Sequence, residues 1–130
     1  MLKEISETDE FYELVAKYIH LEKVTSEIIS AKTGITVRTV DSLRARGAGD
    51  VKHDLKLLIA LAVGLHMTCD DGNRLVNLNG QFLRDNKPTE RYYKYLLSVG
   101  SSYCVAACND YLVKHKQKPL TDNKKISRYD

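Results

Sequence analysis

Residues 25–46 read TSEIISAKTGITVRTVDSLRAR, the pattern of two short helices joined by a tight turn. Thr25 is a favourable N-cap for the first helix, because its hydroxyl can accept a bond from a free backbone N–H group. Gly34 supplies the left-handed conformation that ends a helix tightly. Thr36 can cap the second helix, which we expect to reach about Arg46 before the glycines that follow. The segment therefore predicts a helix-turn-helix arrangement.

Apolar residues with helical spacing extend this pattern in both directions. Before the segment, Ser6 or Thr8 can cap a helix whose buried stripe follows the spacing i, i+3, i+4, i+7, i+8. That stripe consists of Phe11, Leu14, Val15, Tyr18 and Ile19. After the segment, Asp54 can cap a helix through Leu65 that is apolar on nearly all sides, so we expect it at the centre of the domain. No β-strand pattern competes and no internal repeat is visible, so the predicted fold class is all-α.

Three further helices are expected in the second half of the chain. Thr68 and Asp71 have the spacing of a capping box, and Pro88 suits the first turn of the next helix. Ser101 or Ser102 can cap the last helix. The domains predicted are a helix-turn-helix bundle of about five helices in residues 1–80, a two-helix C-terminal extension in residues 81–120 and a polar tail in residues 121–130.

Composition restricts the class of protein. With 130 residues, 43% hydrophobic and 28% charged, the chain is typical of one soluble globular domain. Its longest apolar run, residues 57–65, is about half as long as a membrane span. The N-terminus, MLKEISETDEF, lacks the apolar core of a signal peptide, and three cysteines, an odd number, fit a reducing compartment. We therefore expect a cytoplasmic protein with no membrane partner.

Positive charge is concentrated in two parts of the chain. The formal charge is −4 over residues 1–22, +3 over residues 23–56, zero over residues 57–113 and +4 over residues 114–130. This distribution is compatible with an anionic partner. The alternative is an ordinary solvated surface, which the small total of +3 favours when charge is considered alone.

Several features of this region occur together in one known family. They are the start Thr25-Ser26-Glu27, the apolar Ile29, the turn Gly34-Ile35-Thr36, apolar Val40 and Leu43, and the apolar helix 55–65 followed by a capped helix from Thr68. In these features, residues 10–80 resemble the Cro/lambda-repressor type (Xre-like) helix-turn-helix family. The later stretch LRDNKPTERYYKYLL and a final PL look like small bacterial or mobile-element proteins of this type with a helical C-terminal extension.

The resemblance implies sequence-specific binding of double-stranded DNA and a role as a transcriptional regulator. The second helix would present its exposed side chains to base edges in the major groove, while the first crosses the phosphate backbone. Arg38 would pair with a guanine, Val37 would touch a thymine methyl and Ser42 would bond either base type. The DNA-binding residues implied are Ser26, Thr36, Val37, Arg38, Asp41, Ser42, Arg44, Arg46 and Lys52, and Lys56 is a further candidate for a phosphate contact.

Four of these residues depart from the family pattern. Ser26 is shorter than the glutamine that often bonds a phosphate at this place, and Asp41 brings a negative charge close to the groove face. Arg44 and Arg46 replace the acid and the glycine that are common at the end of the recognition helix. The alternative function is a protein-binding module on the same fold, such as a phage-type antirepressor or a nuclease inhibitor. Asp41, the modest net charge and a tyrosine-rich second half favour that alternative.

The tyrosines of the second half are candidates for a dimer or partner contact. Three of them lie within four residues, so at least one should be exposed, although core packing explains any single one slightly better. The set is Tyr92, Tyr93, Tyr95, Tyr103 and Tyr111. We expect a homodimer, because one short recognition helix reads few base pairs and two-fold pairing sets the half-site spacing.

No other pattern predicts a chemical site. Cys104 and Cys108 could supply half of a zinc site, but no second pair completes it. His53 is expected to be a solvated loop residue. No phosphate-binding glycine loop, GxSxG or HExxH motif occurs. We therefore expect no catalytic residues, no metal and no cofactor, and no enzyme activity.

Overall fold

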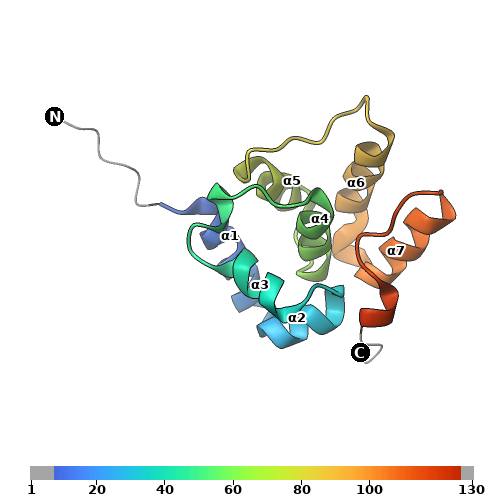
Figure 1. Ribbon diagram of the computed structural model, residues 1–130. Helices are drawn as coiled ribbons and strands as arrows, with labels where there is room; N and C mark the ends of the chain where they lie inside the picture. Colours follow the sequence, from blue (N-terminus) through green and yellow to red (C-terminus); the bar gives the residue numbers. More distant parts are fainter. Residues whose placement is uncertain (1–7, 127–130) are drawn as a thin grey trace.

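The computed structural model describes residues 8–126, which contain no β-strand (Figure 1). The predicted all-α class is therefore confirmed. The helices are α1 (Glu10–Glu22), α2 (Ser26–Thr33), α3 (Val37–Arg44), α4 (Leu55–Gly64), α5 (Cys69–Leu78), α6 (Pro88–Val99) and α7 (Val105–Lys114). Short 3-10 turns are η1 (Ala48–Asp50), η2 (Gly100–Ser102) and η3 (Asn123–Lys125). Within the described residues, no helix is long and apolar enough to cross a membrane.

Helix α4 lies at the centre of the bundle and contacts α2, α5, α6 and α7 (Figure 1). From Leu58 to Leu65 every residue is buried. Each fully buried leucine or isoleucine contributes about 1.5–3 kcal/mol, so this one helix holds the others together. The prediction of a central helix is confirmed, because a helix that is apolar on all sides can be stable in water only when other elements surround it.

Four predicted helix starts are confirmed. In each, a side-chain oxygen accepts a bond of 3.0–3.3 Å from a backbone N–H in the first turn of the helix. The caps are Thr25 for α2, Thr36 for α3, Asp54 for α4 and Thr68 for α5. Pro88 also begins α6 as predicted. These starts are local features, which is why the sequence alone could indicate them.

The predicted cap of α1 is wrong. Asp9, and not Thr8, precedes the helix, and its carboxylate accepts a bond of 3.2 Å from the backbone N–H of Tyr12. The other candidate, Ser6, lies outside the described residues. The second carboxylate oxygen of Asp9 accepts a 2.6 Å bond from the backbone N–H of Gly47. Asp9 is therefore fixed by both the start of α1 and the loop after α3, a role that a serine or threonine hydroxyl is too short to fill.

The other predicted start that differs is that of α7. Ser101 and Ser102 lie in η2, and the helix begins after Cys104, whose side chain makes no capping bond.

Only one half of the capping box predicted at α5 is present, the bond from the backbone N–H of Asp71 to the hydroxyl of Thr68. The Asp71 carboxylate accepts a 2.6 Å bond from the hydroxyl of Tyr18 on α1, and that hydroxyl accepts a 3.3 Å bond from the backbone N–H of Thr68. Tyr18 thus stands between the two groups of the box and joins α1 to α5.

Helices α5 and α7 end in the same hydrogen-bond pattern. At the end of α5 the carbonyl of Val76 accepts a 3.2 Å bond from the N–H of Gln81, and at the end of α7 the carbonyl of Leu112 accepts a 2.8 Å bond from the N–H of Gln117. The residue before each donor, Gly80 or Lys116, has a positive φ. This is a common way for a helix to end, and α1 and α4 end likewise at Lys23 and His66. Similar sequences follow α5 and α7, LRDNK at 83–87 and LTDNK at 120–124.

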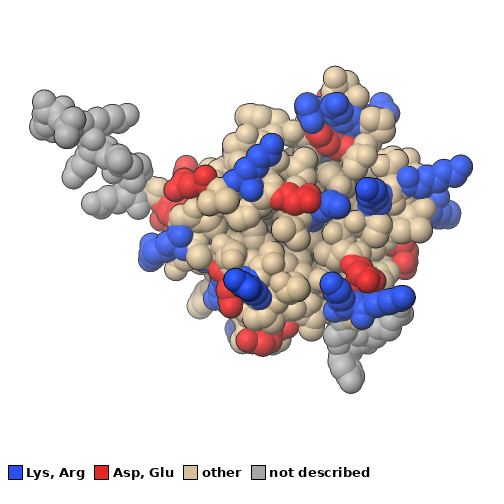
Figure 2. All heavy atoms as spheres, in the orientation of Figure 1, with Lys and Arg blue, Asp and Glu red and all other residues tan. Residues whose placement is uncertain are grey.

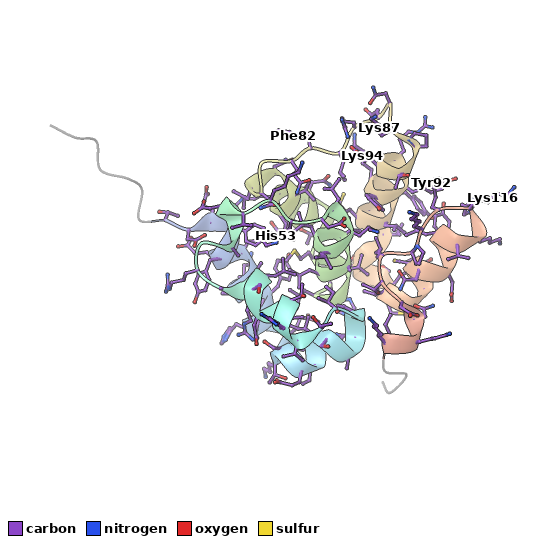
Figure 3. All side chains as sticks on the ribbon, viewed as in Figure 1. His53, Phe82, Lys87, Tyr92, Lys94 and Lys116 are labelled. Carbon is purple, nitrogen blue, oxygen red and sulfur yellow. The ribbon has the colours of Figure 1, made fainter. Side chains whose placement is uncertain are left out.

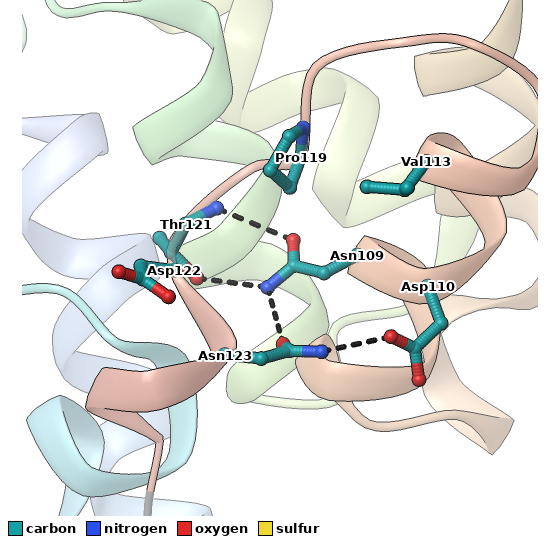
Figure 4. A pocket seen from close by; sticks show the side chains of 7 residues that line it. All are labelled: Asn109, Asp110, Val113, Pro119, Thr121, Asp122 and Asn123. Carbon is teal, nitrogen blue, oxygen red and sulfur yellow. Dashed lines mark hydrogen bonds between the residues drawn. The ribbon is translucent and has the colours of Figure 1, made fainter.

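The polar tail predicted for residues 121–130 packs onto the core as far as the description extends, to Ile126. Asn109 on α7 is 2% exposed, and its amide donates to the hydroxyl of Thr121 and to the side chain of Asn123 (Figure 4). Its carbonyl oxygen accepts a 2.8 Å bond from the N–H of Leu120, which is itself buried. One buried amide therefore holds the whole segment.

The connection between α5 and α6 is fastened by an ion pair. Glu90, only 7% exposed, accepts bonds from the backbone N–H, the Nε and a terminal guanidinium nitrogen of Arg84, at 2.8, 3.1 and 2.8 Å. Hydrogen bonding from Arg84 holds the pKa of Glu90 below its ordinary value. The ionised form is therefore favoured in the folded state, and it contributes stability above the pKa of the unfolded chain.

We expect Glu90→Gln to lower the free energy of unfolding at pH 7 by about 1–2 kcal/mol, because the neutral amide loses the charge-assisted bonds to Arg84. The difference from the wild type should begin to shrink below about pH 4, where the wild-type carboxyl also becomes neutral. Urea unfolding between pH 7 and pH 3 measures it. Asp85→Asn is the control, since its exposed ion pair with Lys94 should matter less. A loss that stays constant with pH would contradict the assignment.

A second prediction concerns the turn between α2 and α3. Gly34 and Gly80 both have positive φ, but a Cβ on Gly34 would lie 2.9 Å from the hydroxyl oxygen of Thr121, whereas one on Gly80 would meet nothing within 4 Å. Gly80→Ala should cost about 1 kcal/mol of backbone strain. Gly34→Ala should cost about 1–3 kcal/mol more, because the segment after α7 must move. Thermal unfolding of both variants tests this, and equal losses would show that the segment does not press on the turn.

Candidate nucleic-acid interface

The turn between α2 and α3 is built around one buried hydroxyl. Thr33, with no exposed surface, donates a 2.7 Å bond to the carbonyl of Ile29 and accepts a 3.1 Å bond from the N–H of Ile35. Gly34 follows with φ +81°, as predicted. Because these bonds satisfy polar groups that the turn would otherwise leave unpaired in the interior, the two helices are held at a fixed angle.

Helix α3 has one face in the core and one face on the surface. Val40 and Leu43 are 1% and 0% exposed and anchor the helix to the bundle. On its other side, the exposed residues are Thr36, Arg38, Asp41 and Ser42, and Val37 is half-buried. The side chains predicted to read bases therefore lie on the solvent-facing side of a short helix that begins at a Thr36 cap. Ser42 bonds the carbonyl of Arg38 within the helix.

Ser26 differs from the role expected for it. Its side chain is buried at 7% exposure, donates a 2.5 Å bond to a carboxylate oxygen of Asp41, and accepts a 3.0 Å bond from the guanidinium of Arg44. The hydroxyl thus joins the start of α2 to the second half of α3. It is not turned toward a partner, and the negative charge of Asp41 is bonded to α2. This cluster cannot be read from the sequence, because it depends on the angle at which the helices cross.

Three of the residues predicted to contact phosphates lie outside this cluster: Arg46, Lys52 and Lys56. Arg46 is exposed and stacks over the ring of Tyr12 on α1, with its guanidinium carbon 4.4 Å from the ring centre. It follows the end of α3 at Arg44, so the helix is two residues shorter than expected. Lys52 is exposed in the segment before α4, and Lys56 is half-buried in its first turn. These three cations come from different parts of the chain, after α3, before α4 and in the first turn of α4.

His53 is not the solvated loop residue that the sequence predicted. Its ring bonds the carbonyl of Ala48 at 2.7 Å and stacks on Phe11, with 6.0 Å between ring centres. Its backbone N–H donates to the side chain of Asn79. Figure 3 shows it among the helices rather than at the rim. His53 is therefore part of the packing that positions the loop after α3.

Charges of both signs surround the candidate interface. On the face drawn in Figure 2, blue and red side chains are interspersed over α1–α3, and most of the blue ones lie toward α6, α7 and η3. Arg38 and Asp41, one helical turn apart, are both exposed on α3. Electrostatic attraction to a polyanion would thus come from several separate cations and not from one continuous basic patch.

The tyrosines of the second half divide into core and surface. Tyr93 is 5% exposed, and burial raises its pKa to about 12, so it belongs to the core. Tyr95 and Tyr103 are 48% and 53% exposed, which confirms that at least one of the set reaches solvent. The half-buried Tyr92 and Tyr111 pack edge to face, with ring centres 6.0 Å apart.

The exposed tyrosines border an apolar cleft between α6 and α7. Its volume is about 210 Å³, and it is lined by Tyr95, Leu96, Val99, Tyr103, Ala107, Cys108 and Tyr111. Aromatic side chains around an apolar hollow are typical of protein contacts. The cleft is separate from α3, so the two surfaces could act independently.

Cys104 and Cys108 differ in their exposure to solvent. Cys104 is exposed at the start of α7, while Cys108 is buried one turn later, and burial raises the pKa of its thiol to about 11. In the part of the chain that the structure describes, no group of three or more histidine, cysteine, aspartate or glutamate side chains is placed to hold a metal ion. Cys108 therefore contributes to packing as a small apolar residue.

No protein-family model, no curated protein and no solved structure matches this chain. The resemblance to the Xre-like family consequently depends on the quoted residues and stays a prediction. The residues that sequence reasoning missed are Tyr12, beneath Arg46, and the pair Asn109 and Thr121. Only the similarity between LTDNK at 120–124 and LRDNK at 83–87 could have pointed to an ordered segment after α7.

Proposed function

We propose that this protein is a sequence-specific DNA-binding protein, and a transcriptional regulator of the Xre-like type, that uses α3 as its recognition helix. The observation that carries the proposal is the two-sided character of this short helix. Val40 and Leu43 hold it in the core, and Arg38 and Ser42 lie on its exposed side next to the capped N-terminus. A helix-turn-helix reads the major groove with residues at this end of its second helix.

Each exposed residue has a distinct part in the proposal. Arg38 pairs with a guanine edge, and Thr36 and Val37 contact the bases or the backbone beside it. Arg46 and Lys52 contact phosphates. The role of Ser26 is changed: its hydroxyl positions α3 against α2 through Asp41 and Arg44 and makes no phosphate contact of its own.

The C-terminal helices supply the dimer contact in this proposal. A single eight-residue recognition helix covers few base pairs, so useful specificity requires a second copy at a fixed spacing. The apolar cleft bordered by Tyr95 and Tyr103 suits a self-complementary contact, because two exposed aromatic rings and a hollow occur on the same surface.

A second candidate function is binding of a protein, as by an antirepressor or a nuclease inhibitor on the same scaffold. The observation that favours it is the exposed carboxylate of Asp41 within the proposed reading face, together with the mixed charges in Figure 2. Such a protein would use the same cleft or α3 against a protein surface, and it would have little affinity for duplex DNA at any salt concentration.

Selection from a randomised duplex pool should enrich one motif for the wild type. Arg38→Ala should lose about 1–3 kcal/mol of discrimination at one position of that motif, measured by fluorescence anisotropy with matched and mismatched duplexes. Arg91→Ala, which removes an exposed arginine from α6, is the control and should keep the preference. If the wild type passes through a DNA column at low salt, the protein-binding candidate replaces the proposal.

Sedimentation velocity tests the dimer. The wild type should sediment as a dimer at micromolar concentration, and the double variant Tyr95→Ser with Tyr103→Ser should shift to monomer, because it removes both exposed rings at the cleft. Phe82→Ser removes an aromatic residue that is even more exposed, at 69%, but lies outside the cleft, and it should leave the dimer intact. A monomeric wild type would rule out this contact.

A further inference from the structure

The segment after α7 lies against the turn that precedes α3. The hydroxyl of Thr121 donates to the carbonyl of Thr33, the last residue of α2. The carbonyl oxygen of Asp122 lies 3.2 Å from the point where a Cβ on Gly34 would stand. Figure 1 shows the same relation, with the red turn η3 beside the end of α2. The residues that follow Thr121 therefore lie near the turn that leads into the proposed recognition helix, although they are far from it in sequence.

Hydrogen bonds fix this position. Besides the bonds from Asn109, the side-chain amide of Asn123 donates a 2.9 Å bond to the carboxylate of Asp110 (Figure 4). The Asp122 carboxylate accepts a 2.9 Å bond from the N–H of Lys124 and so begins η3. Because the backbone of the segment is already ordered, a partner that bound it would not have to order that backbone.

The ordered segment presents two cations. Lys124 and Lys125 are exposed on η3, and neither forms an ion pair within the described part of the chain. Two carboxylates belong to the same region, and each accepts a bond from a neutral N–H group, Asp110 from Asn123 and Asp122 from Lys124. Figure 2 shows blue side chains on this corner of the molecule. The two lysines thus belong to the segment that packs on the turn before α3.

We propose that Lys124 and Lys125 form a third part of the DNA interface and contact the phosphates of one strand bordering the groove that α3 enters. This inference rests on the proposed function. The major groove is about 12 Å wide, so cations on a segment that packs on the turn leading into a helix in the groove are on the side of a bordering strand. These contacts set the orientation and the affinity of the protein, and base preference stays with Arg38.

Salt dependence distinguishes this role from a merely structural one. Binding of the full chain to a mixed-sequence 24-base-pair duplex should weaken as salt is added. The double variant Lys124→Gln with Lys125→Gln should reduce the slope of log K against log salt by about 1.8, because each lost phosphate contact removes about 0.9. Lys114→Gln with Lys116→Gln removes the same charge at the opposite end of α7, where Figure 3 labels Lys116, and should leave the slope unchanged.

A second measurement uses the unaltered protein. Acetylation of lysines, read by mass spectrometry with and without the duplex, should show protection of Lys124 and Lys125 and none of Lys114 and Lys116. The inference is overturned if the wild type binds duplex DNA, the double variant keeps the wild-type salt slope, and the duplex does not protect Lys124 and Lys125 from acetylation. The proposed function would then stand. If the wild type does not bind duplex DNA at all, both are overturned.

Discussion

The angle between α2 and α3 depends on how the three-residue turn between them, residues 34–36, satisfies the polar groups around it. Thr33 sits in the interior with no exposed surface, and its hydroxyl bonds the chain on both sides of the turn. Its carbonyl is bonded by Thr121, which comes from the other end of the chain. An unpaired carbonyl at this depth would cost about 1–3 kcal/mol, so the segment after α7 stabilises the turn by pairing it. The proposed interface therefore depends on residues at both ends of the chain.

The sequence predicted those features that are set within a few residues. Thr25, Thr36 and Thr68 cap their helices, and the apolar faces of α1 and α3 are the ones expected, because helical spacing and capping are local properties. The starts of α1 and α7 were wrong. Asp9 is selected as a cap by its additional bond to Gly47, a residue 38 positions away, and no local pattern contains that information.

The same limit applies to the candidate site. Which residues of α3 face outward followed from the helical period, but the use of Ser26 did not, because its partners Asp41 and Arg44 approach it only through tertiary packing.

The bond between Thr121 and Thr33 has a consequence for the synthesis of the protein. A chain leaves the ribosome from its N-terminus, so α2 and α3 are made long before the residue that completes their turn. The two partners are 88 positions apart, and closing such a loop is slow compared with forming a helix. The proposed interface is thus completed only late in translation, and a chain terminated before residue 121 would contain α3 without the hydroxyl that pairs the carbonyl of Thr33.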